Sequence, residues 1–195
     1  SLMGGEEAPA EREYQDIWVV GETAGGELAP LSAAIVGRAR ELANALGVYV
    51  RGILFGPDAG GAAERMIHLG ADYALVFESP ALAEFELEPY LELLSNQIEE
   101  GRPEMVLFGD TDAAGELAPR LAARFGGPLF AHCVDLSVDE LQRALLATVP
   151  RLGGEFFEIV VAPTARPQFA TVQSGALPMP FADEGRAGEV EIMTA

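Results

Sequence analysis

Residues 104–127, "EMVLFGDTDAAGELAPRLAARFGG", decide the fold because a strand, a turn and a helix follow one another there without a break. The apolar run 105–108 has the pattern of a strand buried on both faces of a sheet. The stretch 113–125 has helical spacing that places Leu117 and Leu121 on one face. A buried strand that leads directly into an amphipathic helix predicts a parallel sheet.

The same unit of strand and helix occurs three times before this stretch, in the alternation expected of right-handed crossovers. The runs "DIWVV", "VYVRGILF" and "DYALVF" are predicted strands over residues 16–20, 48–55 and 72–77. Helices are predicted after them over residues 31–46, 60–69 and 90–101. Together these elements predict an α/β fold of three layers, in which a mostly parallel sheet carries helices on both faces.

After Pro128 the pattern changes, because strand candidates follow one another with no helical stretch between them. They cover residues 129–139, 141–151, 155–162 and 167–173. Gly153 and Gly154 separate two of these runs and indicate a hairpin. We therefore expect this C-terminal portion to be a hairpin-rich mixed sheet whose strands pair through hairpins.

We expect three segments along the chain. Residues 1–15 are a tag remnant and flexible arm, because two residues precede Met3 and little in this stretch can be buried. Residues 16–177 form the α/β domain. Residues 178–195 form a C-terminal tail, in which the alternating apolar residues of 189–195 can add an edge strand.

The chain of 195 residues carries 31 acidic and 12 basic side chains, for a net charge of −19. Such a field repels phosphate backbones and anionic lipids, so we expect neither nucleic acid nor a membrane surface as a partner. No apolar run approaches the roughly 18 residues of a membrane span, and no signal peptide is visible, so we expect a cytoplasmic protein. The acidity fits either a solvated surface or a docking face for a basic partner.

Cys133 is the single cysteine and the two histidines are His68 and His132, so we expect neither an internal disulfide nor a metal site. The apolar neighbours of Cys133 favour a buried thiol over a reactive one. Each histidine lacks a nucleophile nearby in sequence, which favours a structural role over a general base. Lysine, GxGxxG and GxSxG are all absent from the sequence, which excludes Schiff-base chemistry and Walker-type phosphate binding and disfavours a hydrolase.

Gly109, Asp110, Thr111 and Asp112 follow a predicted strand at the edge where open α/β sheets bind ligands. Gly109 suits a tight turn, and the polar residues after it can cap the next helix. Gly109, Asp110, Thr111 and Gly115 could instead contact an adenine nucleotide, or the turn could meet another subunit. Against a nucleotide, both aspartates place negative charge where phosphate would lie, and no basic residue is close in sequence.

Five phenylalanines concentrate in the second half of the chain, where they either complete the core or form an interface. We expect the core. The five are Phe130, Phe156, Phe157, Phe169 and Phe181.

Three stretches, "IWVVGETAGGELAPLSAAIVGRARELANALG", "LAPRLAARFG" and "ARPQFATVQSGAL", carry a resemblance to a known family. They lie in order within residues 16–176, and "LAPRLAARFG" is the most specific of them. The chain resembles the N-terminal domain of the alpha subunit of electron transfer flavoproteins. Its fold thereby resembles the adenine nucleotide alpha hydrolase-like, Rossmann-like group.

The resemblance implies an electron-carrier component, not an enzyme. It would be a scaffold that pairs with a beta-like subunit in a flavin-dependent complex between dehydrogenases and an acceptor. In that family FAD is held mainly by a second alpha-subunit domain and AMP lies in the beta subunit, so FAD is not expected on this chain alone. The FAD-binding C-terminal domain has no counterpart in this sequence, so the chain is the N-terminal half of a longer subunit, a natural short paralogue, or the partner of a separate chain that supplies that domain. The alternative is a stand-alone adenine-nucleotide-binding module, because universal stress proteins resemble this fold.

Overall fold

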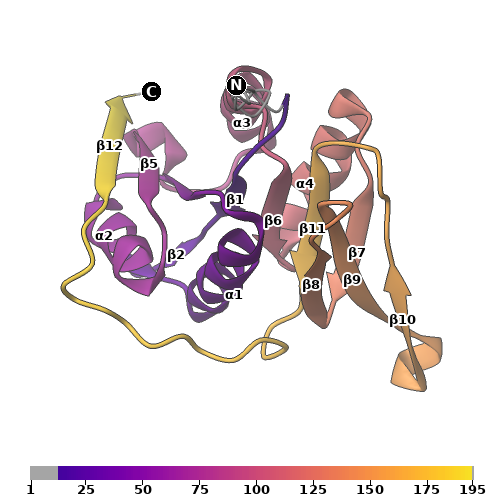
Figure 1. The fold of residues 1–195 in the computed structure, drawn as a ribbon. Helices are drawn as coiled ribbons and strands as arrows, with labels where there is room; N and C mark the ends of the chain where they lie inside the picture. Colours follow the sequence, from indigo (N-terminus) through magenta and orange to yellow (C-terminus); the bar gives the residue numbers. More distant parts are fainter. Residues whose placement is uncertain (1–12, 195) are drawn as a thin grey trace, which may run out of the picture.

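The computed structural model describes residues 13–194, so residues 1–12 of the predicted arm lie outside the described residues. Seven strands form one sheet in the order β12-β5-β4-β1-β6-β11-β7, and every neighbouring pair is parallel (Figure 1). The strands are β1 Ile17–Val20, β4 Val50–Phe55, β5 Tyr73–Glu78, β6 Met105–Gly109, β7 Leu129–Cys133, β11 Gln168–Val172 and β12 Glu189–Thr194. This sheet confirms the predicted α/β class.

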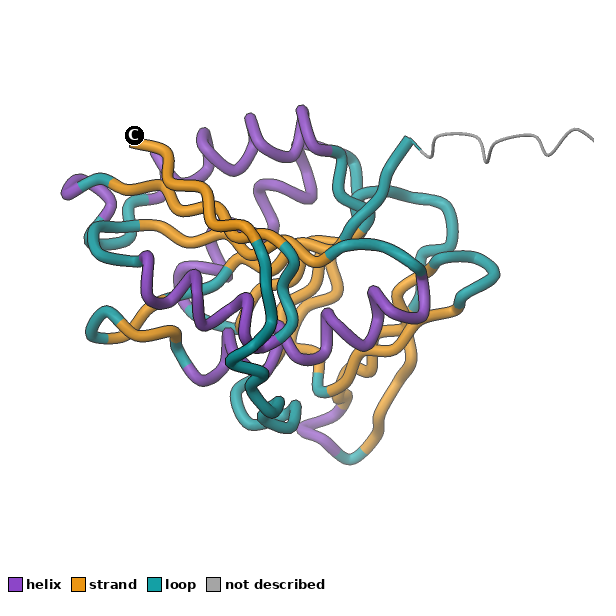
Figure 2. Tube along the Cα trace, turned by 60° about the vertical axis from the view of Figure 1, so that its left-hand side comes forward, coloured by secondary structure: helices purple, strands orange, loops and turns teal. Residues whose placement is uncertain are grey.

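Helices lie on both sides of the strands (Figure 2). They are α1 Pro30–Leu46, α2 Gly60–Leu69, α3 Leu87–Gly101 and α4 Asp112–Phe125. Ile17 and Val19 of β1 pack in one core cluster with apolar residues of α1 and α2. Trp18 and Val20 point the other way and pack with residues of α3 and α4. This alternation confirms the three predicted layers, with β1 buried between two pairs of helices.

Short elements fill two connections at the carboxyl ends of the strands. The chain after β1 forms a small hairpin of β2 Thr23–Ala24 and β3 Glu27–Leu28, whose turn contains Gly25 and Gly26 at positive φ. A short 3₁₀ helix, η1 Pro80–Leu82, precedes α3.

A second sheet of three antiparallel strands, in the order β10-β9-β8, stands beside β7. Its strands are β8 Asp135–Asp139, β9 Ala144–Arg151 and β10 Phe156–Val160. The 3₁₀ turn η2 Leu152–Gly154 joins β9 to β10, with both of its glycines at positive φ. The predicted hairpin at this Gly-Gly pair is therefore confirmed.

Two expectations for the second half of the chain were wrong. Residues 129–139 are not one strand, because β7 ends at Cys133 and the chain bends at Val134, passing from the parallel sheet to β8 in the antiparallel sheet. Nor do all the later strands pair through hairpins, since β11 lies parallel between β6 and β7. All five residues of β11 are buried, as expected of a strand that has a parallel neighbour on each side.

A buried ion pair fastens the antiparallel sheet to the parallel one. Glu104, which precedes β6 and is 3 % exposed, accepts from Arg143 Nε at 2.8 Å and from Arg143 Nη2 at 2.7 Å. The Gln168 side chain, also buried, accepts from the backbone N–H of Leu145 at 2.7 Å. The base of the antiparallel sheet is thus held by contacts with residues at the amino ends of β6 and β11.

Residues 178–188 form a strap that runs from the end of β11 past α1 and α2 to β12 (Figure 1). Arg186 of the strap donates to Asp72 Oδ1 at 2.9 Å, and Arg40 of α1 donates to Asp72 Oδ2 at 2.7 Å. These contacts hold the strap against the body of the protein, and β12 follows it at the edge of the sheet beside β5. None of the helices in residues 13–194 has the length and apolar character needed to span a membrane.

Candidate functional site

The turn after β6 is held by hydrogen bonds on both sides. The Asp110 N–H donates to the carbonyl of Val172 at 2.8 Å. Thr111 is the N-cap of α4, and its hydroxyl oxygen accepts from Ala114 N–H at 3.2 Å. The same hydroxyl donates to Glu22 Oε2 at 2.7 Å. Of the predicted capping residues, Thr111 is the one that caps the helix.

The two glycines predicted at this site differ in what surrounds them. A Cβ on Gly109 would lie 2.6 Å from Leu31 Cδ2, so a larger residue there would displace the Leu31 side chain of α1. A Cβ on Gly115 would meet nothing within 4 Å. Pro119 lies inside α4, four residues after Gly115. A proline ring in a helix crowds the carbonyl four residues before it, which here is the carbonyl of Gly115.

The fold brings a basic group to Asp110 that sequence reasoning missed. His132 Nδ1 lies 2.6 Å from Asp110 Oδ2, although the two residues are 22 positions apart. They meet because β6 and β7 flank β11, so both carboxyl ends reach the same edge of the sheet. The His132 side chain is 67 % exposed and that of Asp110 is 22 % exposed. The pair is a surface feature next to the turn.

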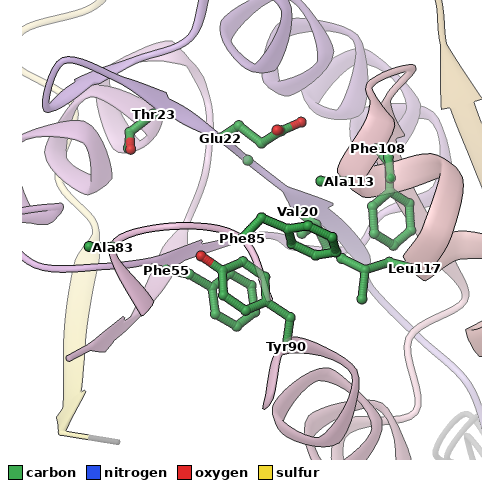
Figure 3. Close-up of a pocket in the computed structure, with 12 residues that line it drawn as sticks. Val20, Glu22, Thr23, Phe55, Ala83, Phe85, Tyr90, Phe108, Ala113 and Leu117 are labelled. Atoms are coloured by element: carbon green, nitrogen blue, oxygen red, sulfur yellow. The ribbon is translucent and has the colours of Figure 1, made fainter. Parts of the chain in front are cut away.

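A pocket of about 140 Å³ opens next to this turn, between β1, α3 and α4 (Figure 3). None of the four residues predicted to contact a nucleotide, Gly109, Asp110, Thr111 and Gly115, lines it. The lining residues are Val20, Gly21, Glu22, Thr23, Phe55, Ala83, Phe85, Tyr90, Phe108, Ala113, Ala114 and Leu117. It lies where strand order diverges from β1 towards β4 on one side and β6 on the other, the place where open α/β sheets bind ligands.

Aromatic rings form one wall of the pocket. Phe55 and Tyr90 stack with ring centroids 4.1 Å apart, and Phe85 meets Tyr90 edge-on at 5.1 Å. The Tyr90 hydroxyl donates to the carbonyl of Leu82 at 2.7 Å. Burial, and secondarily the charge of Glu22, raise the pKa of Tyr90, so the phenol stays protonated at neutral pH.

The reactive residue types lie outside this pocket. Cys133 is fully buried, its thiol donates to the carbonyl of Phe130 at 3.3 Å, and burial followed by the charge of Asp110 raises its pKa to about 12. His68 lies in the last turn of α2, 3.1 Å from Glu184 of the strap. Within residues 13–194, no three His, Cys, Asp or Glu side chains are grouped to hold a metal ion.

The outer strand of the antiparallel sheet exposes an apolar surface that we call the β10 patch. It consists of Leu152, Phe156, Phe157, Ile159 and Val161, which are between 47 % and 73 % exposed. The strand projects from the body at the far side from β12 (Figure 1).

The expectation that all five phenylalanines complete the core was therefore wrong for three of them. Phe130 and Phe169 are buried, whereas Phe156 and Phe157 are 60 % and 64 % exposed. Phe181 lies in the strap and is fully exposed. β10 is the last strand of its sheet, and all its residues except Val160 are exposed, so its aromatic side chains remain in solvent.

The parallel sheet, its two helical layers and the pocket at the carboxyl ends define the chain as a Rossmann-like α/β protein. The family model described as "Electron transfer flavoprotein domain" matches residues 17–195. The chain belongs to this family, as the resemblance in its sequence implies.

The relatives of this chain include alpha subunits of electron transfer flavoproteins and proteins similar to them. The electron transfer flavoprotein subunit alpha of Thermoanaerobacterium thermosaccharolyticum is 35% identical over 178 residues, covering 91% of this chain and 54% of the relative. The lactate dehydrogenase (NAD(+),ferredoxin) subunit LctC of Acetobacterium woodii is 33% identical, covering 92% and 43%. Protein FixB of Rhizobium meliloti is 33% identical, covering 87% and 49%. The chain thus spans about half the length of the curated relatives it matches.

Proposed function

We propose that this chain is the scaffold part of an alpha-type electron transfer flavoprotein subunit. It pairs with a beta-like subunit in a flavin-dependent complex that carries electrons from dehydrogenases to an acceptor. In this proposal FAD belongs to the assembled complex, on a further domain or a separate chain, and AMP lies in the beta-like partner. Family membership and the alpha-subunit relatives support the role.

The β10 patch is the observation that best supports pairing with a beta-like subunit. Five large apolar side chains lie together on a projecting hairpin, and exposed apolar patches on soluble proteins mark association sites. Phe157, Ile159 and Val161 alternate along the chain and so share one face of the sheet. Aromatic side chains of this kind are enriched at the centres of interfaces, where burial removes their surface from water.

FAD does not fit the pocket between β1 and α4. Pockets that enclose ligands of drug size have volumes of about 300–1,000 Å³, well above the volume here. Its 12 lining residues include the carboxylate of Glu22 and no basic side chain that would neutralise a pyrophosphate. In this proposal the chain acts through its surfaces, and the flavin is held elsewhere in the complex.

Pairing is tested by mixing the chain with a beta-like subunit from the same source and measuring the complex by analytical ultracentrifugation. The wild-type chain is expected to form a one-to-one complex, and Phe157→Asp to lose at least tenfold in affinity. Phe181→Asp is the matched control, because it changes the same residue type at an exposed position outside the patch. Equal affinity for both variants would count against the β10 patch as the interface.

A separate experiment on the chain alone tests the proposal that FAD is held elsewhere in the complex. After incubation with FAD and removal of free cofactor, the chain should show no flavin absorbance. A stoichiometric flavin spectrum would contradict the scaffold role.

A stand-alone adenine-nucleotide-binding module is the second candidate, and the position of the pocket at the switch of strand order favours it. The acidic lining disfavours a phosphorylated ligand. Calorimetric titration of the chain with AMP and ATP tests this candidate, and micromolar binding would promote it above the scaffold role.

A further inference from the structure

The pocket between β1, α3 and α4 has the form of a small-molecule site independently of any partner subunit. Val20 comes from β1, Phe55 from β4 and Phe108 from β6, so three adjacent strands contribute to it. Leu117 of α4 and Tyr90 of α3 close it from the helical layer (Figure 3). The β10 patch contributes none of the lining residues.

The size and lining of the pocket suit one flat ring. An engineered apolar cavity of about 150 Å³ in another protein holds a benzene molecule, which sets the scale for a cavity of about 140 Å³. Phe108 and Leu117 are almost fully buried, whereas Phe85 and Tyr90 are partly exposed at the opening. A ring held here would contact aliphatic and aromatic carbon on several sides while its substituents reach solvent.

Glu22 supplies the polar group that would orient such a ring. Its Oε2 accepts from the Thr111 hydroxyl at 2.7 Å, which fixes the carboxylate beside the start of α4. Among residues 13–194, no group donates a hydrogen bond to its Oε1. A carboxylate oxygen in this position accepts and cannot donate, so it selects a ligand with an N–H group.

Charge excludes a phosphate from the same place. Glu22 is the sole charged residue among those that line the pocket. A ligand phosphate would approach its carboxylate with no cation in the lining to offset the repulsion. The side chain of His132 pairs with Asp110 and does not line the pocket.

We propose that this pocket binds an uncharged planar heterocycle bearing an exocyclic amino group, such as the base of an aminopurine nucleoside. The ring lies against the apolar walls, and the amino group donates to the Glu22 carboxylate. Recognition stops at the base, because the pocket offers nothing to a phosphate.

The proposal is tested by isothermal titration calorimetry of the full chain with three probes: adenosine, inosine and AMP. Adenosine is expected to bind. Inosine, in which a carbonyl replaces the amino group and N1–H is the remaining donor on that edge, is expected to bind at least tenfold more weakly, because its carbonyl oxygen would lie against the Glu22 carboxylate. AMP is also expected to bind at least tenfold more weakly than adenosine.

Three variants separate recognition from folding. Glu22→Gln keeps the shape of the side chain but supplies an N–H donor besides its acceptor oxygen, so it should reduce the preference of adenosine over inosine at least severalfold. Ala113→Phe fills the pocket and should abolish binding of all three probes. Gly115→Ala lies on the same helix outside the pocket and should leave binding unchanged. Circular dichroism confirms that each variant is folded.

Three results would overturn the proposal. They are no heat of binding with adenosine at millimolar concentration, equal affinity for adenosine and inosine, and tighter binding of AMP than of adenosine. Because these titrations use the lone chain, their outcome is separate from that of the subunit-pairing experiment.

Discussion

Replacing Glu104 with alanine should destabilise the chain by about 3–5 kcal/mol, the range for breaking one side of a buried ion pair. The size follows from the surroundings of the pair. Glu104 is 3 % exposed and accepts two charge-assisted hydrogen bonds, at 2.8 and 2.7 Å. Without it, the Arg143 guanidinium, itself 21 % exposed, keeps its hydrogen bond to the carbonyl of Leu46 at 3.0 Å but loses its counter-charge.

Urea denaturation followed by circular dichroism measures this loss as a lower free energy of unfolding. Thermal unfolding should show a midpoint lower by about 6–20 °C, since a chain of this size loses roughly 2–4 °C per kcal/mol. Glu158→Ala is the control, because Glu158 pairs with Arg151 at 2.7 Å but both side chains are more than half exposed. That variant should lose less than about 1 kcal/mol. Equal losses in the two variants would refute the role given to the buried pair.

Three further outcomes are expected. The Cys133 thiol should not react with a thiol reagent at pH 8 in the folded chain, because its pKa is raised to about 12, and should react after unfolding in urea. The same shift should lower the free energy of unfolding as the pH rises from 9 towards 12, since the folded chain holds the thiol proton that the unfolded chain releases; Cys133→Ala should reduce this slope and leave the part due to the raised pKa of Tyr90. Gly109→Ala should destabilise the chain by about 1–3 kcal/mol, because its Cβ would overlap Leu31, whereas Gly115→Ala should stabilise it by about 0.5–1 kcal/mol in the urea assay. Rapid labelling of Cys133, a flat pH profile, or equal effects of the two alanine substitutions would each contradict the corresponding expectation.

The parallel half of the fold could be predicted because its signals are local. Each buried strand is a continuous apolar run, and each helix carries its apolar residues at helical spacing within one segment. The hairpin at Gly153 and Gly154 was predictable for the same reason, because a turn is set by adjacent residues. By contrast, "LFAHCVDLSVD" looks like one strand, although a bend at Val134 divides it between two sheets.

Long-range contacts account for what the sequence did not predict. Glu104 and Arg143 are 39 residues apart, and nothing in either local pattern indicates that they pair. Asp110 meets His132 only because β11 is inserted between β6 and β7. The exposure of Phe157 depends on the position of β10 at the outside of its sheet, which the apolar pattern of the strand does not reveal.

Hydrogen exchange of the chain, measured with and without the beta-like subunit, tests the central claim most directly. If the β10 patch is the surface that meets the partner, the amides of Phe156–Val160 should exchange more slowly in the complex, while those of the strap at 178–188 stay unchanged. Protection confined to other parts of the chain, with β10 exchanging at its free rate, would contradict the claim.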